Sequence, residues 1–162
     1  MSWVDSILAT LDKMGYVGAF LAGFLGASIP FFPSFILIPL LATQLNPLIV
    51  GVVSGIGAGF GQYLHYYIGL GGRHLFSSES QVRFERWRDR HAKYGAWLIL
   101  LLAVTPLTPD DIIWIPLGLM RYPKVKALAA GIVGKTILSL VYAYAGYYGW
   151  PMIDQFLNNW GL

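Results

Sequence analysis

Long apolar stretches, broken at prolines, alternate with short polar segments along the chain. Two stretches, residues 16–29 and 95–105, are short, and each ends at a Pro-x-x-Pro motif that is followed by another run of about a dozen residues. Two others, at about 49–70 and 125–148, are longer. A helix needs about 20 apolar residues to cross a bilayer, at roughly 1.5 Å rise per residue. The long stretches are therefore predicted to cross the membrane, whereas the short ones cannot do so singly.

The short apolar runs fit re-entrant helical hairpins, which enter the membrane, turn near its midplane and leave on the same side. Non-helical backbone at that depth is tolerated only where protein buries it or water reaches it. The prolines of the two Pro-x-x-Pro motifs are expected to form the hairpin turns; they are Pro30, Pro33, Pro106 and Pro109. The alternative is that each hairpin is instead two short helices that both cross a thin membrane. Two crossings return the chain to the side on which it started, so the predicted sides of the later segments do not change.

Five landmarks of the first half recur in the same order in the second half, at an offset of 76 to 80 residues. The corresponding features are KMG at 13–15 and KYG at 93–95, PFFP at 30–33 and PLTP at 106–109, Pro39 and Pro116, Pro47 with Gly55 and Pro123 with Gly131, and Y-x-G-x-x-G at 67–72 and at 144–149. Five features in one order at a near-constant offset indicate an internal duplication.

The duplication predicts an all-α integral membrane protein with a single domain, residues 1–162. Each unit is expected to be a re-entrant hairpin followed by one full transmembrane helix, with the first unit at about 13–72 and the second at about 93–149. A hairpin adds no crossing and a helix adds one, so the second unit starts on the opposite side and the repeat is inverted. Residues 1–15 and the linker 73–93 are predicted to be interfacial amphipathic helices.

Small residues recur at helical spacing in the first long stretch. Gly51, Gly55 and Gly59 form two consecutive G-x-x-x-G steps, and Gly57 and Gly61 form another. Faces of small residues let helix backbones approach closely. These glycines are therefore predicted to pack the two units together.

Basic residues are concentrated on the side that the chain reaches after its first crossing. Nine lysines and arginines lie there, against Lys13 on the starting side. Because cytoplasmic loops carry an excess of Lys and Arg, segment 73–93 is predicted to be cytoplasmic, with both termini outside the plasma membrane. Phe84, Trp87 and Tyr94 share a face among arginines, so this segment is expected to lie on the cytoplasmic leaflet and attract anionic lipid. A solvated charged linker is the alternative.

The composition agrees with a membrane protein and excludes several other classes. The chain is 56% hydrophobic and 12% charged, whereas a soluble domain carries about 25% charged residues. A net charge of +3 without a basic motif argues against a nucleic-acid partner. Without cysteine there are no disulfides or thiolate metal sites. No second histidine stands at metal-ligand spacing, so neither a metal nor another cofactor is expected.

The order of motifs resembles one known family. KYG, an apolar run, P-x-x-P, IPLG, RYP and G-Y-x-G follow one another, and the similarity extends over roughly 13–149. This pattern resembles the DedA family, also called the SNARE-associated or VTT-domain family. The resemblance implies two re-entrant hairpins that face each other from opposite leaflets. It also implies a role in moving lipids: polyprenyl-phosphate carriers in bacteria and phospholipid scramblases in eukaryotes.

The chain departs from the bacterial members of that family at three positions. Those members usually carry an acid after the Pro-Ser of the first hairpin, where this chain has Phe35. They also carry two arginines around the first proline of the second hairpin, where this chain has Ala103 and Pro109. The resemblance is therefore to a divergent branch, of archaeal type, that lacks the usual residues of the proton-coupled mechanism.

Asp110 and Asp111 stand at the tip of the second predicted hairpin, where an ionised side chain is costly. One interpretation is helix capping: an Asp at the start of the half-helix 110–120 satisfies its free N–H groups and suits the helix dipole. Ser34 would do the same in the first unit. The other interpretation is that the pair also has a functional role, because capping accounts for one Asp at the hairpin tip and leaves the second unexplained.

Further polar residues are predicted at the same depth. Lys135 follows Gly131 by one helical turn and is the expected partner of an Asp, in a functional or purely structural ion pair. Gln62 and His65 share a helix face, and His65 is either a proton relay or a packing residue beside tyrosines. The predicted substrate- or ion-binding set is Asp110, Asp111, Lys135, Ser34, Thr108, Gln62 and His65.

These features favour a transporter of membrane lipids, such as a scramblase or flippase of phospholipids or polyprenyl phosphates. Inverted repeats with broken helices place transport sites at the midplane, and helix N-termini attract phosphate. Arg121, Lys124 and Lys126 are expected to gather anionic headgroups. The carboxylates would repel a phosphate unless they are protonated or paired with Lys135, so protons are a candidate partner.

Two other functions are weighed against lipid transport. An ion-coupled exporter of small molecules would use the same architecture. An intramembrane aspartyl protease needs two carboxylates that share a proton, but adjacent residues on a helix point about 100° apart. Ser54 and His65 are separated by about 16 Å along one helix, too far for a serine enzyme. No enzyme activity and no catalytic residue are therefore expected.

Overall fold

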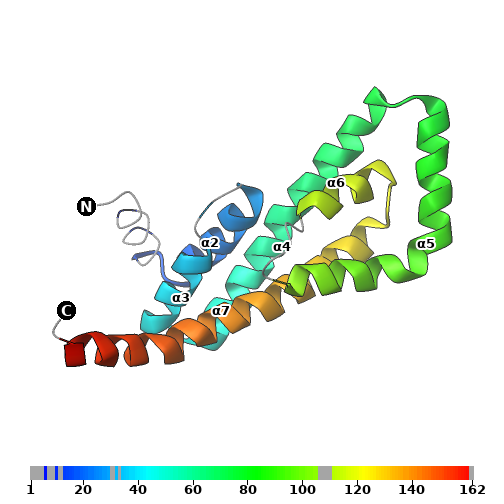
Figure 1. Cartoon of the computed structure of the whole chain (residues 1–162). Coiled ribbons are helices and arrows are strands. Elements are labelled where there is room, and N and C mark those ends of the chain that lie inside the picture. Colours follow the sequence, from blue (N-terminus) through cyan, green and yellow to red (C-terminus); the bar gives the residue numbers. More distant parts are fainter. Residues whose placement is uncertain are drawn as a thin grey trace.

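The computed structural model describes residues 6, 10, 13–29, 32, 34–105 and 111–160, excluding the side chains of Ala92, Asp111, Ile112, Trp150 and 152–160. Within this part of the chain every regular element is a helix, which confirms the predicted all-α class. The elements are α2 (Tyr16–Ser28), α3 (Ser34–Gln44), α4 (Pro47–Gly72), the 3-10 helix η1 (Arg73–Leu75), α5 (Ser78–Val104), α6 (Asp111–Leu119) and α7 (Lys124–Trp160) (Figure 1).

Two of these helices are long and apolar enough to cross a membrane. They cover Pro47–Leu75 and Lys124–Gly149, which confirms the two long stretches predicted from the sequence. The first begins where the chain supplies both a cap and a proline. The side chain of Asn46 accepts hydrogen bonds from the backbone N–H groups of Leu48 and Ile49, at 3.0 and 3.4 Å, and Pro47 fits the first helical position.

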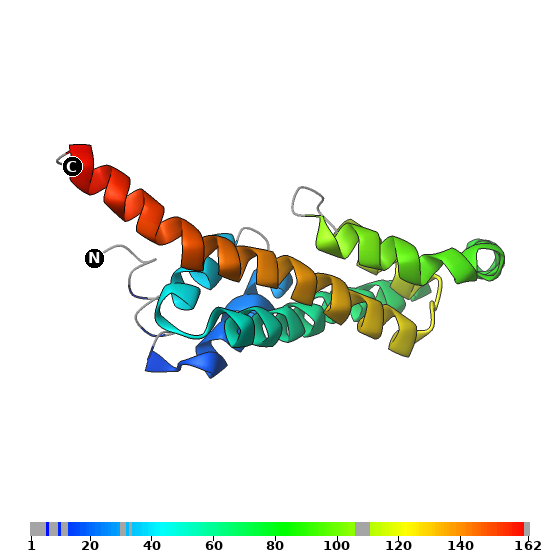
Figure 2. The same ribbon diagram turned by 90° about the horizontal axis from the view of Figure 1, so that it is seen from below.

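Helices α4 and α7 pack antiparallel at close range, and Figure 2 shows them side by side along the molecule. A Cβ added to Gly55 would lie 2.7 Å from the backbone nitrogen of Thr136. One helical turn to either side, Gly51 faces Leu140 and Gly59 faces Ile132 in the same way. The prediction that the glycines of α4 join the two halves of the chain is confirmed for these three, but it is wrong for Gly57 and Gly61, which pack on α2 of the first half.

The short helices pack around this pair. The opposite small face of α4 receives α2, because Gly57 lies against the backbone of Phe20. On α7, Gly134 lies against Leu100 of α5, whose carbonyl oxygen would be 3.1 Å from an added Cβ. In addition, α3 packs on α7 and α6 packs on α4. Each short helix therefore rests on one of the two long ones.

The predicted linker helix and the first arm of the second hairpin are one continuous helix. Helix α5 runs without interruption through Ser78–Val104, and Figure 1 shows that it changes direction part-way along. Its apolar part, Lys93–Val104, is the segment that packs on α7. The sequence boundary placed at residue 93 therefore lies inside a continuous helix and not in a loop.

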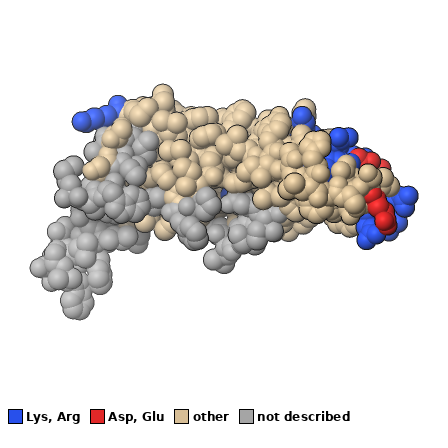
Figure 3. Space-filling view, turned by 90° about the horizontal axis from the view of Figure 1, so that it is seen from above, with Lys and Arg blue, Asp and Glu red and all other residues tan. Residues whose placement is uncertain are grey.

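Charged side chains gather at one end of the molecule. Figure 3 shows most of the described Lys, Arg, Asp and Glu residues at the end formed by the first half of α5, with an uncharged surface along the body. Seven of the basic residues there belong to the segment from Arg73 to Lys93 and the turn before α7: Arg73, Arg83, Arg86, Arg88, Arg90, Lys93 and Arg121. This clustering agrees with the charge asymmetry read from the sequence.

The close approach of α4 and α7 makes Gly55 intolerant of a side chain. We expect Gly55→Ala to lower the free energy of unfolding by about 1–3 kcal/mol, because the new methyl group meets the backbone of Thr136. Gly71→Ala is the matched control on the same helix, since nothing lies within 4 Å of its added Cβ. Thermal unfolding in detergent compares the two; an equal effect at both positions would contradict the close packing.

Candidate functional site

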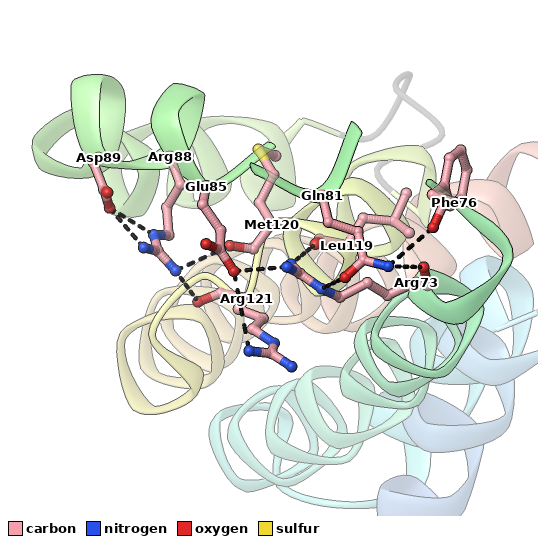
Figure 4. A network of polar contacts seen from close by, with 9 residues as sticks. All are labelled: Arg73, Phe76, Gln81, Glu85, Arg88, Asp89, Leu119, Met120 and Arg121. Atoms are coloured by element: carbon pink, nitrogen blue, oxygen red, sulfur yellow. Dashed lines mark hydrogen bonds and ion pairs between the residues drawn. The ribbon is translucent and has the colours of Figure 1, made fainter. Parts of the chain in front are cut away.

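The charged end is organised around Arg73, whose side chain is 6% exposed. Its Nε donates to Oε1 of Gln81 at 3.0 Å, and its Nη2 donates to Oε1 of Glu85 at 2.6 Å. Its Nη1 donates to the carbonyl oxygen of Leu119 at 2.9 Å (Figure 4). One guanidinium at the end of α4 therefore joins α5 to the C-terminus of α6.

A second arginine, on α5, reaches the next two carbonyl groups along the chain. Nη1 of Arg88 donates to the carbonyl oxygens of Met120 and Arg121, at 3.3 and 3.5 Å. The same side chain forms an ion pair with Asp89 at 2.7 Å. Cations near the last carbonyl groups of a helix complement its dipole. Arg73 and Arg88 together satisfy the C-terminal end of α6.

The turn after α6 has the hydrogen bonds of a Schellman motif. The N–H of Tyr122 donates to the carbonyl of Leu117, and the N–H of Arg121 donates to that of Gly118, both at 3.0 Å. Arg121 has a φ of 52°, the left-handed conformation that usually selects glycine at this position. The hydroxyl of Tyr66 donates to the carbonyl of Tyr122 at 2.7 Å and so links the turn to α4.

Tyr122 is buried at the centre of this turn. Burial raises the pKa of its hydroxyl, while a backbone hydrogen bond with Ala96 acts in the opposite direction. The phenol is therefore neutral near pH 7. It contributes a fixed apolar wall and no charge.

A cavity of about 430 Å³ opens beside this turn. It is lined by Tyr66, Leu70, Arg73, His74, Arg121, Tyr122, Pro123 and Lys124; we call it the basic cavity. Nζ of Lys124 lies 5.2 Å from the centre of the Tyr67 ring, within cation–π range. The structure thus brings Arg121 and Lys124, two of the three predicted headgroup residues, into one site. Lys126 lines a different, mostly apolar recess with Trp97 and Ala130.

An apolar cavity of about 340 Å³ lies between α5 and α6. Trp87, His91 and Tyr94 line it on α5, and Ile113, Pro116 and Leu117 line it on α6. The rings of Trp87 and His91 stack with their centres 4.4 Å apart. This cavity offers an apolar lining with Arg88 and His91 as its basic members.

The predicted midplane residues are only partly described. Ser34 and Asp111 are the first residues of α3 and α6, and the side chain of Ser34 contacts Gly26. Gln62 is fully buried on α4, while His65 and Lys135 are half-buried. The remaining predicted positions, Pro30, Pro33, Pro106, Thr108, Pro109 and Asp110, lie outside the described residues. The pairing of Lys135 with an Asp stays a prediction.

Sequence reasoning counted Arg73 only as one of nine basic residues and did not single out Glu85, Gln81 or His74. A weak signal was present, because Arg73 directly follows the long apolar helix that ends in two glycines. Among the described residues, no group of three His, Cys, Asp or Glu side chains is placed to hold a metal ion.

Comparison with known proteins gives one match. The family model described as the VTT domain matches residues 32–148, which is most of the chain. No curated protein and no solved structure matches. The matched segment includes α3 through α7 up to Tyr148, and therefore both long helices and the basic cavity.

The left-handed conformation of Arg121 carries a measurable cost. We expect the free energy of unfolding of Arg121→Gly to exceed that of Arg121→Ala by about 1 kcal/mol, since only the alanine keeps a Cβ at a positive φ. Both variants lose the same charge, so their difference isolates the backbone. Chemical unfolding in detergent measures it, and two equally stable variants would contradict the assigned conformation.

Proposed function

The chain belongs to the VTT-domain family, also called the DedA family, and we propose that it moves lipids between membrane leaflets. Members of this family are membrane proteins proposed as transporters or flippases. The family match over residues 32–148 carries the proposal. The substrates are phospholipids or polyprenyl phosphates, and the protein acts as a scramblase or flippase and not as an enzyme.

The proposed architecture is an inverted repeat of two re-entrant hairpins, α2–α3 and the apolar part of α5 with α6. Crosswise contacts support it. Gly146 on α7 lies against Pro39 of α3, and its counterpart in the repeated Y-x-G-x-x-G motif, Gly69 on α4, lies against Ile115 of α6. The second helix of each proposed hairpin, α3 or α6, thus packs on the long helix of the other unit.

Contacts inside each unit also correspond. The carbonyl oxygen of Phe20 lies against Gly57 in the first unit. In the second unit the carbonyl oxygen of Leu100 lies against Gly134. Equivalent backbone contacts in both halves are what a repeat of two similar units requires. The basic end then faces the cytoplasm of a cell with this protein in its plasma membrane, and both termini face outward.

The proposed transport site lies between the two hairpin tips. Helix α3 begins directly after the first Pro-x-x-Pro motif, and α6 begins two residues after the last proline of the second. Their N-termini would point positive dipole ends at the same region, an arrangement that suits a phosphate headgroup. Gln62 and Lys135 on the long helices supply polar groups from inside the bundle. Asp111 is proposed to pair with Lys135, while Asp110 caps the half-helix.

Labelling of single introduced cysteines tests the orientation, because the native chain has no cysteine. We expect a cysteine at Ser78 to react with a membrane-impermeant reagent from the cytoplasm, and one at Lys13 to react from outside. Sealed right-side-out and inside-out vesicles give the two accessibilities. Reaction of both positions from one side would refute the inverted repeat.

The proposed function is tested by lipid movement in vesicles that contain the purified protein. We expect a fluorescent phospholipid or polyprenyl phosphate to equilibrate between leaflets without added energy. If Asp111 and Lys135 are a buried pair, Asp111→Asn and Lys135→Met should each cost roughly 3–5 kcal/mol of stability, and the double variant should recover much of it.

The control for this experiment is Asp110→Asn, which keeps a capping acceptor and should change stability little. A stable but inactive double variant would assign the pair to transport. Additive losses of stability would show that Asp111 and Lys135 do not touch. If no lipid moves but the vesicles exchange a small solute for an ion, the lipid-transport proposal is wrong and the protein is an ion-coupled exporter.

A further inference from the structure

The basic cavity collects positive charge from three separate segments. Arg73 and His74 come from η1 after α4, Arg121 comes from the turn after α6, and Lys124 begins α7. No carboxylate lines the cavity among the described residues. Glu85 lies outside the lining, pairs with Arg73 at 2.6 Å and lies 4.0 Å from Nη1 of Arg121. Figure 4 shows Glu85 between these two guanidinium groups.

One carboxylate does not balance this cluster. Glu85 faces both Arg73 and Arg121, and Lys124 is directed over the ring of Tyr67. The cavity therefore keeps an excess positive charge before any contribution from His74. An excess of this kind is stabilised by a bound anion, because charge-assisted hydrogen bonds from arginine and lysine to phosphate are strong.

The positive groups differ in how firmly they are held. The three hydrogen bonds of Arg73 fix it as part of the wall. The side chain of Arg121 is 58% exposed, and within the described part of the chain its one ion pair is the long contact to Glu85. Its planar guanidinium can therefore present two parallel N–H groups to a ligand, which is the geometry that binds phosphate oxygens.

The backbone of Arg121 gives an independent reason to assign it a function. Its positive φ costs energy that glycine would avoid. Strained positions of this type cluster at functional sites. The hydrogen bonds of the Schellman motif and the Tyr66 hydroxyl hold the strained turn in place. The chain thus keeps an arginine where the fold by itself favours glycine.

We propose that the basic cavity binds the phosphate group of a lipid headgroup at the cytoplasmic leaflet, with Arg121 and Lys124 as its ligands and Arg73 as a fixed positive wall. The inference rests on the proposed function only for its place in the membrane. The cavity volume of about 430 Å³ is within the range of small-ligand sites. The site lies at the surface end of the helices and is separate from the proposed midplane site.

Direct binding to the purified full-length protein in detergent tests this site. The probes are short-chain phosphatidic acid, short-chain phosphatidylcholine and inorganic phosphate, titrated by calorimetry. We expect phosphatidic acid to bind, and Lys124→Gln and Arg121→Gly each to weaken that binding by about tenfold, the loss typical of one charge-assisted hydrogen bond. Arg121→Gly also relieves the strained backbone, so weaker binding in this variant is not due to misfolding.

The matched control is Arg90→Gln, which removes one positive charge from exposed α5 without touching the cavity. Unchanged binding in this control supports a defined site, whereas an equal loss would overturn it in favour of diffuse attraction to charge. Much tighter binding of phosphatidic acid than of phosphate identifies a lipid headgroup as the ligand. Equal binding of the two overturns the lipid assignment and leaves a phosphate site.

Lipid movement is measured separately, so the two proposals fail in different ways. Wild-type affinity in both cavity variants would overturn the headgroup site and leave lipid transport standing. Intact, variant-sensitive binding in a protein that moves no lipid would support the site and reject the proposed function.

Discussion

The close antiparallel contact between α4 and α7 is the constraint on which the other packing depends. Glycines remove the side chains from this interface, so the two backbones meet and the outer faces remain available to α2, α3, α5 and α6. Between helices in a bilayer there is no hydrophobic driving force, and association relies on close packing and hydrogen bonds. A side chain at Gly55 would therefore displace the surface on which every short helix rests.

The buried guanidinium of Arg73 is the second organising contact. A charge removed from water is tolerated when its donors are satisfied and a counter-ion is near, and here Gln81, Glu85 and the carbonyl of Leu119 meet that requirement. Arginine suits this position because its planar group serves three partners at once. The consequence is that the charged half of α5 and the end of α6 are held as one unit at the charged end of the molecule.

This arrangement separates two kinds of polar site. The basic cavity is built from segments at the ends of helices, where long basic side chains keep their charged groups in water. Gln62 and Lys135 lie within the long helices, where polar groups are costly and usually functional. A lipid phosphate that is first held at the surface and then passed to the midplane would meet these groups in that order, and this is the route that our two proposals describe.

The sequence by itself determined the helical class, the two long apolar helices, the family and the concentration of basic residues at one end. These properties depend on local composition and spacing, which are visible in a single chain. It also predicted that Gly51, Gly55 and Gly59 form an interface, because small residues at that spacing have one common use. Only the tertiary structure decided that α3 packs on α7 and α6 on α4, that α5 continues through its bend, and that Arg73 reaches Leu119. Those contacts join residues far apart in the chain, and no local pattern encodes on which long helix a given short helix packs.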